Sequence, residues 1–210
     1  MGRPSNTTQR RGQIIKAFVK VVAKQGYDGA TISEIAQKAG LAQGLVHYHF
    51  KNKLEILLAA LELITAEHQA RLDVRLAACA EDPSAEVAAF IDVHLGLGAH
   101  SSPDALGCWV IIGAEAIRQK EVRQAFEAAL EAMAERLRLI IERGIKARSF
   151  DCDDAGAAAA ALLATIEGYF VVAGSARAII PSGSAARSTV AMAEGLLKPS
   201  KRLRLPKVSS

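Results

Sequence analysis

The sequence has few of the features that mark secreted, metal-binding or membrane proteins. Its 210 residues include three cysteines without CxxC spacing, so neither a disulfide framework nor a zinc knuckle is expected. Arg3, Arg10 and Arg11 precede further lysines instead of an uncharged apolar run, which argues against a cleavable signal. The longest late charge-free apolar stretch, 155–166, has 12 residues, whereas a membrane span needs roughly 18. We therefore expect a cytoplasmic protein with reduced thiols and no membrane partner.

Motifs of the common enzyme classes are also missing. The chain contains no HExxH, GxSxG, P-loop or dinucleotide fingerprint. A helical enzyme would have to rely on Glu115, His94 or Cys108, and no catalytic motif accompanies these residues. No segment of useful length alternates apolar and polar residues as a strand does. We therefore expect neither catalysis nor a cofactor, and no sheet.

Apolar residues instead recur every three or four positions along almost the whole chain, which predicts an all-α fold. Half of the residues are apolar, enough for a substantial core. Turn-forming Gly, Pro, Ser and Asp residues divide the chain into nine segments. The predicted helices span residues 8–25, 32–39, 43–50, 53–80, 84–98, 104–118, 120–148, 152–176 and 184–197.

Positive charge is concentrated at the two ends of the chain. Residues 1–55 carry nine Lys and Arg residues against three acids, a net charge of +6. Residues 56–197 carry twelve against nineteen, a net charge of −7, and residues 198–210 carry five basic residues and no acid. A basic head on an acidic body suggests that the head meets a polyanion. A basic, solvated surface without a partner is the alternative.

The segment after the first predicted helix has the features of a helix-turn-helix. Thr31 and Glu34 have the spacing of a capping box, in which each side chain accepts from the other residue's backbone amide. Gly40 can adopt the left-handed conformation that ends a short helix, and a second short helix follows at once. This plan places the second helix in the DNA major groove. An ordinary helical hairpin is the alternative.

The content of the second short helix favours DNA binding. Val46 and Phe50 are four residues apart and can face the core, which turns Gln43, His47 and Tyr48 outward. Amide, imidazole and phenol groups can reach base edges or phosphate oxygens. A metal site at His47 and His49 is the alternative, but residues two apart on a helix point to different faces, so none is expected.

The stretches Thr31 to Gly40 and Gly44 to Lys53 resemble the DNA-binding head of the TetR family of bacterial repressors. The family's gapped pattern covers about residues 8 to 56, with His47 replacing the usual Tyr and Val46 the usual Leu. The resemblance implies phosphate contacts from the short-helix start, base contacts from the second helix, and a backbone clamp after them. Thr31 and Ser33 are the implied phosphate contacts at the start of the first short helix. Gln43, Gly44 and Leu45 are the implied base contacts, with Ala42 beside them against a thymine methyl. His47, Tyr48 and Lys53 are the residues implied to clamp the DNA backbone.

The same resemblance implies a DNA-binding domain (1–53) and a ligand-binding and dimerisation domain (54–197). The tail (198–210) has five basic residues and two prolines, which predicts a solvated, mobile end; non-specific DNA binding by the tail is the alternative. The stretch 109–144 is similar to the sensory half of the family's choline-responsive branch. Choline is not carried over, because a quaternary ammonium cage needs several aromatic rings and the chain has one Trp. The predicted ligand-lining residues are Phe90, His94, Trp109, Glu115, Phe126, Met133, Tyr169 and Phe170.

Both of the polar residues in that set have a structural alternative. Glu115 is the single charge in the apolar stretch 105–117, so it must pair with an Arg such as Arg118 or Arg143, reach solvent, or meet a ligand. His94 lies on an apolar stripe and can equally be a packed core residue.

The last two predicted helices are rich in small residues, which allows close helix packing. In the family these helices form a four-helix dimer interface, and residues 153–197 fit that role; packing within one chain is the alternative. The sequence therefore predicts a homodimeric, ligand-responsive repressor that an unknown small-molecule effector releases from a palindromic operator in double-stranded DNA. A sequence-indifferent architectural DNA-binding protein is the remaining alternative.

Overall fold

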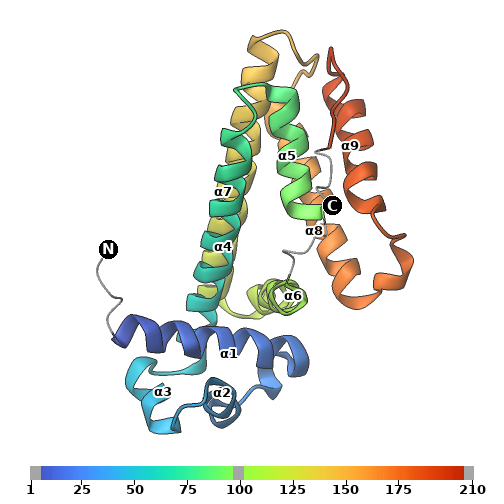
Figure 1. Cartoon of the computed structure of the whole chain (residues 1–210). Helices are drawn as coiled ribbons and strands as arrows, with labels where there is room; N and C mark the ends of the chain where they lie inside the picture. The colour runs from blue at the N-terminus through green and yellow to red at the C-terminus, as the bar shows by residue number, and fades with distance from the viewer. Residues whose placement is uncertain (1–5, 97–101, 206–210) are drawn as a thin grey trace. The chain divides into compact units, whose positions relative to one another are not determined.

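The computed structural model describes residues 6–96 and 102–205, and every regular element within these ranges is a helix (Figure 1). Nine α-helices and one 3-10 helix occur there, and each predicted helix overlaps one of them, which confirms the predicted all-α fold. The elements are α1 (Asn6–Gly29), α2 (Ile32–Ala39), α3 (Gln43–His49), α4 (Lys53–Ala77), α5 (Pro83–Leu95), α6 (Pro103–Arg118), α7 (Lys120–Lys146), α8 (Ala155–Ser175), η1 (Arg177–Ile179) and α9 (Ser184–Leu197).

Helices α2 and α3 pack against the apolar face of α1. Ile14, Phe18 and Val22 are spaced four apart, as one face of a helix requires, and all three are completely buried. The predicted break after Gln25 occurs inside α1, where Gly26 has φ 78° and kinks the helix. That left-handed conformation carries little penalty only for glycine.

Local capping fixes the start and the end of α2. The Glu34 amide donates to the Thr31 hydroxyl at 3.2 Å, and the Thr31 amide donates to the Glu34 carboxylate at 3.0 Å. The predicted capping box is therefore present. At the other end, Gly40 has φ 67° and its amide donates to the last carbonyls of α2. The chain can then reverse and begin α3 at Gln43.

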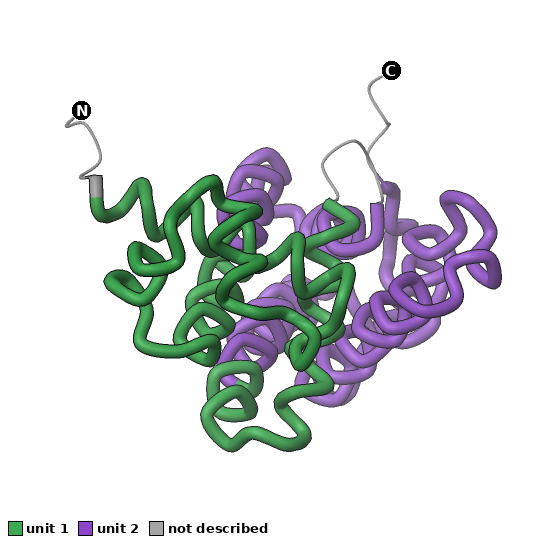
Figure 2. Tube along the Cα trace, turned by 90° about the horizontal axis from the view of Figure 1, so that it is seen from below, with its two compact units in different colours: residues 1–66, 101–127 green, residues 67–100, 128–210 purple. Residues whose placement is uncertain are grey.

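The chain forms two compact units (Figure 2). Unit 1 comprises residues 1–66 and 101–127, and unit 2 comprises residues 67–100 and 128–210. Within unit 1, α6 packs along α1, and a Cβ on Gly107 would lie 3.3 Å from the Ala23 Cβ. The two helix backbones therefore approach closely there. This grouping differs from the predicted domains 1–53 and 54–197, which stay a prediction.

In unit 2, α5, α8 and α9 pack on one another, and the following segment is anchored to them. The Leu203 side chain is buried, and its amide donates to the Glu194 carboxylate at 2.9 Å. The Ser200 amide donates to the Ser149 carbonyl at 2.8 Å. Ser200 and Leu203 thus contact the rest of unit 2. The mobile basic tail predicted for 198–210 stays a prediction, and residues 206–210 lie outside the described residues.

Helix α8 passes the length and composition test for a membrane span, with a hydropathy of 1.6 over the most apolar window. The charge-free run of 12 residues considered above stops before Glu167. The test for a membrane span allows one such charge, so the whole of α8 passes it. Apolar core helices of soluble proteins pass the same test, so α8 alone does not indicate a membrane. About a third of that window, 33%, is buried within the chain, which leaves much apolar surface uncovered.

Candidate DNA-binding surface and effector site

The predicted DNA-contacting side chains lie on one exposed stretch of unit 1. Tyr48 is 79% exposed, an unusual position for a large aromatic ring in a protein without a partner there. A Cβ on Gly44 would meet no atom within 4 Å, so packing within the chain does not require glycine at this position. Seven of the nine predicted residues are exposed, and the other two, Leu45 and Lys53, are half-buried; the exposed seven are Thr31, Ser33, Ala42, Gln43, Gly44, His47 and Tyr48.

An apolar underside and one arginine hold α3 in place. Val46 and Phe50 are 0% and 2% exposed, as predicted for the core-facing residues. The Arg11 guanidinium donates to the His49 carbonyl at 2.6 Å and lies 4.1 Å from the centroid of the Phe50 ring. Arg11 therefore supports the negative end of the α3 dipole. Sequence reasoning missed this contact, because it joins residues 38 positions apart.

Lys53 is bound within the head. Its ammonium donates to the Tyr27 carbonyl at 2.7 Å and to the Ala30 carbonyl at 3.0 Å, and lies 4.3 Å from the Tyr27 ring centroid. Two of its three donors are thus engaged in holding the end of α1 against the start of α4. One donor stays available for a phosphate, so the predicted phosphate contact remains a prediction with a structural role beside it.

Glu115 pairs with its neighbours at the end of α6. Arg118 donates to one carboxylate oxygen at 2.5 Å and Gln119 to the other at 2.7 Å. Arg118 also reaches Asp28 at 3.5 Å, and Gln119 acts on the Tyr27 hydroxyl by lowering its pKa. Burial and the Glu115 carboxylate raise the pKa of the Tyr27 hydroxyl. Of the predicted alternatives for Glu115, the structure therefore has the ion pair with Arg118.

A polar chain consequently connects α6 with the base of the recognition helices within unit 1. Gln119 donates to Glu115, both residues act on the pKa of the Tyr27 hydroxyl, and the carbonyl and ring of Tyr27 contact the Lys53 ammonium. Lys53 begins α4 four residues after His49, the last residue of α3. A movement of α6 relative to α1 would therefore disturb the support of the DNA-contacting surface.

Trp109 and Phe126 pack against each other inside unit 1. Their ring centroids are 4.9 Å apart at 50°. A Cβ on Gly113 would lie 3.2 Å from the Phe126 ring, so glycine makes room for that ring. Two predicted ligand-lining residues are thus neighbours in a packed aromatic pair.

Phe90 and His94 form a second pair, in unit 2, together with His68. The His94 Nδ1 lies 2.7 Å from the Phe90 carbonyl, which can only accept, so Nδ1 carries the hydrogen. Arg71 can only donate and lies 3.3 Å from His68 Nδ1. The two Nε2 atoms are 2.9 Å apart, so His68 Nε2–H donates to His94 Nε2. This arrangement requires both imidazoles to be neutral.

Burial makes that neutral state stable. Loss of solvation, together with a smaller effect of the nearby His68, lowers the pKa of His94 to about 3. Burial and Arg71 lower the pKa of His68 to about 4. His94 is therefore a hydrogen-bonded core residue in this structure, the alternative named for it above.

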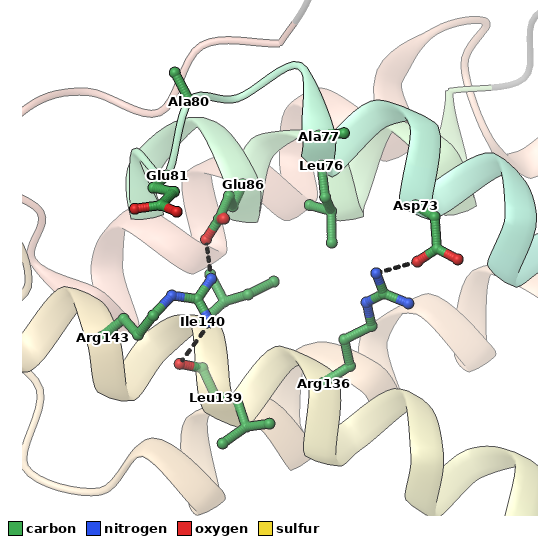
Figure 3. Close-up of a pocket in the computed structure, with 10 residues that line it drawn as sticks. All are labelled: Asp73, Leu76, Ala77, Ala80, Glu81, Glu86, Arg136, Leu139, Ile140 and Arg143. Atoms are coloured by element: carbon green, nitrogen blue, oxygen red, sulfur yellow. Dashed lines mark hydrogen bonds and ion pairs between the residues drawn. The ribbon is translucent and has the colours of Figure 1, made fainter.

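The cavity of unit 2 has a different lining from the one predicted. Its volume is about 780 Å³, and it lies among the end of α4, the start of α5 and the middle of α7 (Figure 3). Arg136 pairs with Asp73, and Arg143 pairs with Glu86, whose side chain is 8% exposed. None of the eight predicted ligand-lining residues is among those that line it: Asp73, Leu76, Ala77, Ala80, Glu81, Glu86, Arg136, Leu139, Ile140 and Arg143.

The remaining predicted ligand contacts do not form one group. Met133 is buried, and Tyr169 and Phe170 on α8 are half-buried. Trp109, Glu115 and Phe126 belong to unit 1, whereas Phe90, His94, Met133, Tyr169 and Phe170 belong to unit 2. Their role as ligand contacts stays a prediction. Sequence patterns could not indicate the observed cavity, because its two ion pairs join residues 63 and 57 positions apart.

Cys108, one of the residues considered for catalysis, is inert in this environment. Burial raises the pKa of its thiol to about 12. The thiolate is the reactive form of cysteine, and at neutral pH it is therefore almost absent.

An exposed second helix, reached through a glycine turn and supported by an apolar underside, defines a helix-turn-helix DNA-binding protein. Residues 14–60 match the family described as "Bacterial regulatory proteins, tetR family". Residues 83–198 match the family described as "BetI-type transcriptional repressor, C-terminal". The chain belongs to the TetR family and carries a BetI-type C-terminal domain. It is a DNA-binding transcriptional regulator and not an enzyme, which confirms the resemblance seen in the sequence.

Individual relatives agree with this assignment. The HTH-type transcriptional regulator BetI of Rhizobium meliloti (strain 1021) is 30% identical over 162 residues, which cover 77% of this chain and 76% of that protein. A TetR transcription regulator from Haloarcula marismortui has the same fold, with TM-score 0.79, 22% identity, and coverage of 90% of this chain and 99% of that chain. A transcriptional regulator from Saccharomonospora viridis, solved in complex with choline, has TM-score 0.76, 22% identity, and coverage of 90% and 95%.

Proposed function

We propose that this regulator is a homodimeric repressor that binds a near-palindromic operator and is released from it by a small-molecule effector. The observation that carries the proposal is the exposed α2–α3 surface, where polar and aromatic side chains face outward from a firmly packed underside. In such proteins the second helix enters the major groove and reads base edges. Gln43, Gly44 and Leu45 would face the bases, with Ala42 beside them, and Thr31, Ser33, His47, Tyr48 and Lys53 the phosphates.

Uncovered apolar surface on the last helices supports a dimer. Val171, Ile179, Met192 and Leu196 expose large apolar side chains on α8, η1 and α9. A second copy of the chain would cover this surface by isologous packing. Two heads in one dimer would then enter successive major grooves about 34 to 36 Å apart, which predicts two half-sites in the operator.

The cavity of unit 2 supports effector binding. At about 780 Å³ it is large enough for a small organic molecule, and its apolar floor is bordered by carboxylates and guanidinium groups. Choline, the ligand in the Saccharomonospora viridis structure, is the first compound to test. No aromatic side chain lines this cavity, so a cation would be held here by carboxylates such as Glu86 and Glu81 rather than by rings.

Release from the operator would follow from movement of α6 against α1. The chain from Glu115 through Gln119 and Tyr27 to Lys53 supports this route, because it ends beside α3. The effector needs different affinities for the two conformations, and it then shifts their populations. A regulator of this kind acts on the bacterial chromosome, so we place the protein in the cytoplasm.

Thermodynamic linkage gives the test. Fragments of the source organism's genomic DNA that the protein retains are selected first. Choline is then titrated into the protein with and without a selected duplex. If choline is the effector, duplex must weaken choline binding by the same factor by which choline weakens duplex binding. Equal choline affinities in both titrations would reject choline as an effector. Equal retention of random and selected duplexes would instead favour an architectural DNA-binding protein.

A further inference from the structure

We propose that the groove between α1 and α2 binds backbone phosphates of the DNA that flanks the base pairs read by α3. The groove has a volume of about 420 Å³ and lies in unit 1. Its lining combines three lysines with two glutamines, the donors that suit phosphate oxygens. The lining residues are Lys20, Val21, Lys24, Gln25, Glu34, Gln37 and Lys38.

The recognition helix itself lacks the charge that DNA affinity needs. Helix α3 contains neither Lys nor Arg, although neutralised phosphates supply most of the salt-dependent affinity for DNA. Arg11 and Lys53, the nearby basic residues, spend donors on carbonyls of the head. Lys51, two residues after α3, is exposed and adds one charge, and further charge has to come from another part of the same surface.

The groove has an excess of positive charge, with three lysines against the single carboxylate of Glu34. Among the described residues, Lys20, Lys24 and Lys38 are exposed and make none of the hydrogen bonds or ion pairs found in the head. The three acids of residues 1–55 are occupied by other groups. Glu34 accepts from Thr31, Glu55 accepts from the Lys51 amide, and Asp28 faces Arg118.

The arrangement suits a run of phosphates better than a single anion. Lys16, also exposed, precedes Lys20 and Lys24 at the same four-residue spacing on α1. Residues four apart advance about 6 Å along a helix, and successive phosphates of one strand advance about 3.4 Å. The row therefore covers several neighbouring phosphates. Glu34, which lines the groove, is the capping partner of Thr31, so the groove continues the predicted DNA-contacting surface.

The inference rests on the DNA binding that defines the family, and it needs neither a dimer nor an effector. The test compares wild type with the variant Lys20→Gln, Lys24→Gln, Lys38→Gln. A control variant, Lys120→Gln, Lys146→Gln, Arg148→Gln, removes three exposed positive charges outside the groove. Circular dichroism verifies that helix content is unchanged. Fluorescence anisotropy then gives the affinity for a long duplex at a series of salt concentrations.

Each phosphate contact adds about 0.9 to the slope of log affinity against log salt concentration. The groove variant should therefore lose about 2.7 from that slope, and wild type should lose about 40-fold more affinity than the variant between about 50 and 200 mM salt. The control should keep the wild-type slope. The loss should be the same on random and selected duplexes, because phosphate contacts carry no sequence information.

Two outcomes would overturn the proposal while leaving the regulator's DNA binding intact. One is a groove variant with the wild-type slope on a duplex that wild type binds well. The other is loss of inorganic pyrophosphate binding in the groove variant without any change of slope on DNA. That result would assign the groove to a small phosphate compound instead of the DNA backbone.

Discussion

The outer side of α3 in the head exposes polar and aromatic side chains, whereas the body buries or pairs its conspicuous polar residues. Tyr48 and Gln43 face solvent from α3. Glu115 and His94, the two polar residues singled out in the body, are 5% and 6% exposed and bind groups of their own chain. Exposed groups without a partner indicate a surface for another molecule. Buried polar groups that are already satisfied indicate a stabilising role first.

Packing in the two regions also differs in what it supports. In the head, the apolar residues of α1, Val46 and Phe50 form a firm base under a short helix that has little contact area of its own. In unit 2, two ion pairs connect helices around a cavity, and a histidine pair outside its lining connects α4 with α5. Packing in the head therefore fixes the position of the exposed side of α3. In the body, a ligand can replace a partner in the ion pairs, and a proton can break the hydrogen bond of the histidine pair.

The largest expected effect comes from removing the base of α3. Phe50→Ala deletes a ring that is 2% exposed and that carries the Arg11 guanidinium, so it should cost about 3 to 5 kcal/mol of stability. Thermal unfolding followed by circular dichroism measures the loss, and DNA binding should disappear with it. Tyr48→Ala, on the exposed side of the same helix, is the control and should leave the unfolding temperature unchanged. Equal destabilisation by both would contradict the two-sided description of α3.

A smaller effect is expected from acid on the histidine pair of the body. The pKa of His94 in the folded protein, about 3, lies below its ordinary value of 6.5, so the unfolded chain takes up the proton first. Stability should therefore fall as pH drops below about 6.5, with a slope of up to about 1.4 kcal/mol per pH unit from this residue. Urea unfolding at several pH values measures the slope.

The matched variant for this titration is His94→Asn, whose amide can still donate to the Phe90 carbonyl. It should be less stable at pH 7 and should lose the part of the acid dependence that His94 contributes. An unchanged acid dependence in the variant would mean that other groups cause the loss of stability.

The next effect concerns DNA recognition and is expected from Gln43→Ala. This change removes an exposed amide that can pair with a base edge, so discrimination between selected and altered duplexes should fall by about 1 to 3 kcal/mol. The slope of affinity against salt should stay the same, because no phosphate contact is lost. Competition binding with single-base-pair variants of the selected duplex measures both quantities. An equal loss of affinity for all duplexes would instead mean that Gln43 contacts a phosphate and does not read a base.

The smallest effect is expected from Lys53→Ala. This variant distinguishes the structural role of the Lys53 ammonium in the head from its predicted contact with a DNA phosphate. Loss of the contacts to Tyr27 and Ala30 should reduce the stability of the head by about 1 kcal/mol. If the third donor also binds a phosphate, the salt slope should fall by roughly 1. Unfolding and salt titrations on the same sample distinguish the roles. A stability loss with an unchanged slope would leave Lys53 a purely structural residue.

The sequence predicted the parts of the fold and site that depend on short-range patterns. The capping box at Thr31 and Glu34 and the turn at Gly40 are signals within a few residues, and both occur as predicted. The ion pair of Glu115 with Arg118 was one of two named choices, and the nearer partner is correct. Contacts between distant residues could not be predicted. Arg11 reaches α3 across 38 positions, and Lys53 reaches Tyr27 across 26.

The sequence did not indicate the lining of the body cavity, for the same physical reason, and the ligand contacts predicted from it stay a prediction. Conspicuous residues such as Trp109 and Phe126 are large and apolar, so they fill space by packing together instead of bordering a cavity. The cavity is bordered by ordinary charged residues of α4, α5 and α7, for example Glu86 and Arg143, and nothing in their local sequence distinguishes them from a solvated helix face.

The most direct test of the account is sedimentation of the purified protein with a duplex selected from its genome, in low-salt buffer. We predict that two chains bind each duplex, and that Gln43→Ala lowers the preference for this duplex over a scrambled one without changing the number of chains bound. A single chain per duplex, or no complex at all in low salt, would contradict the account.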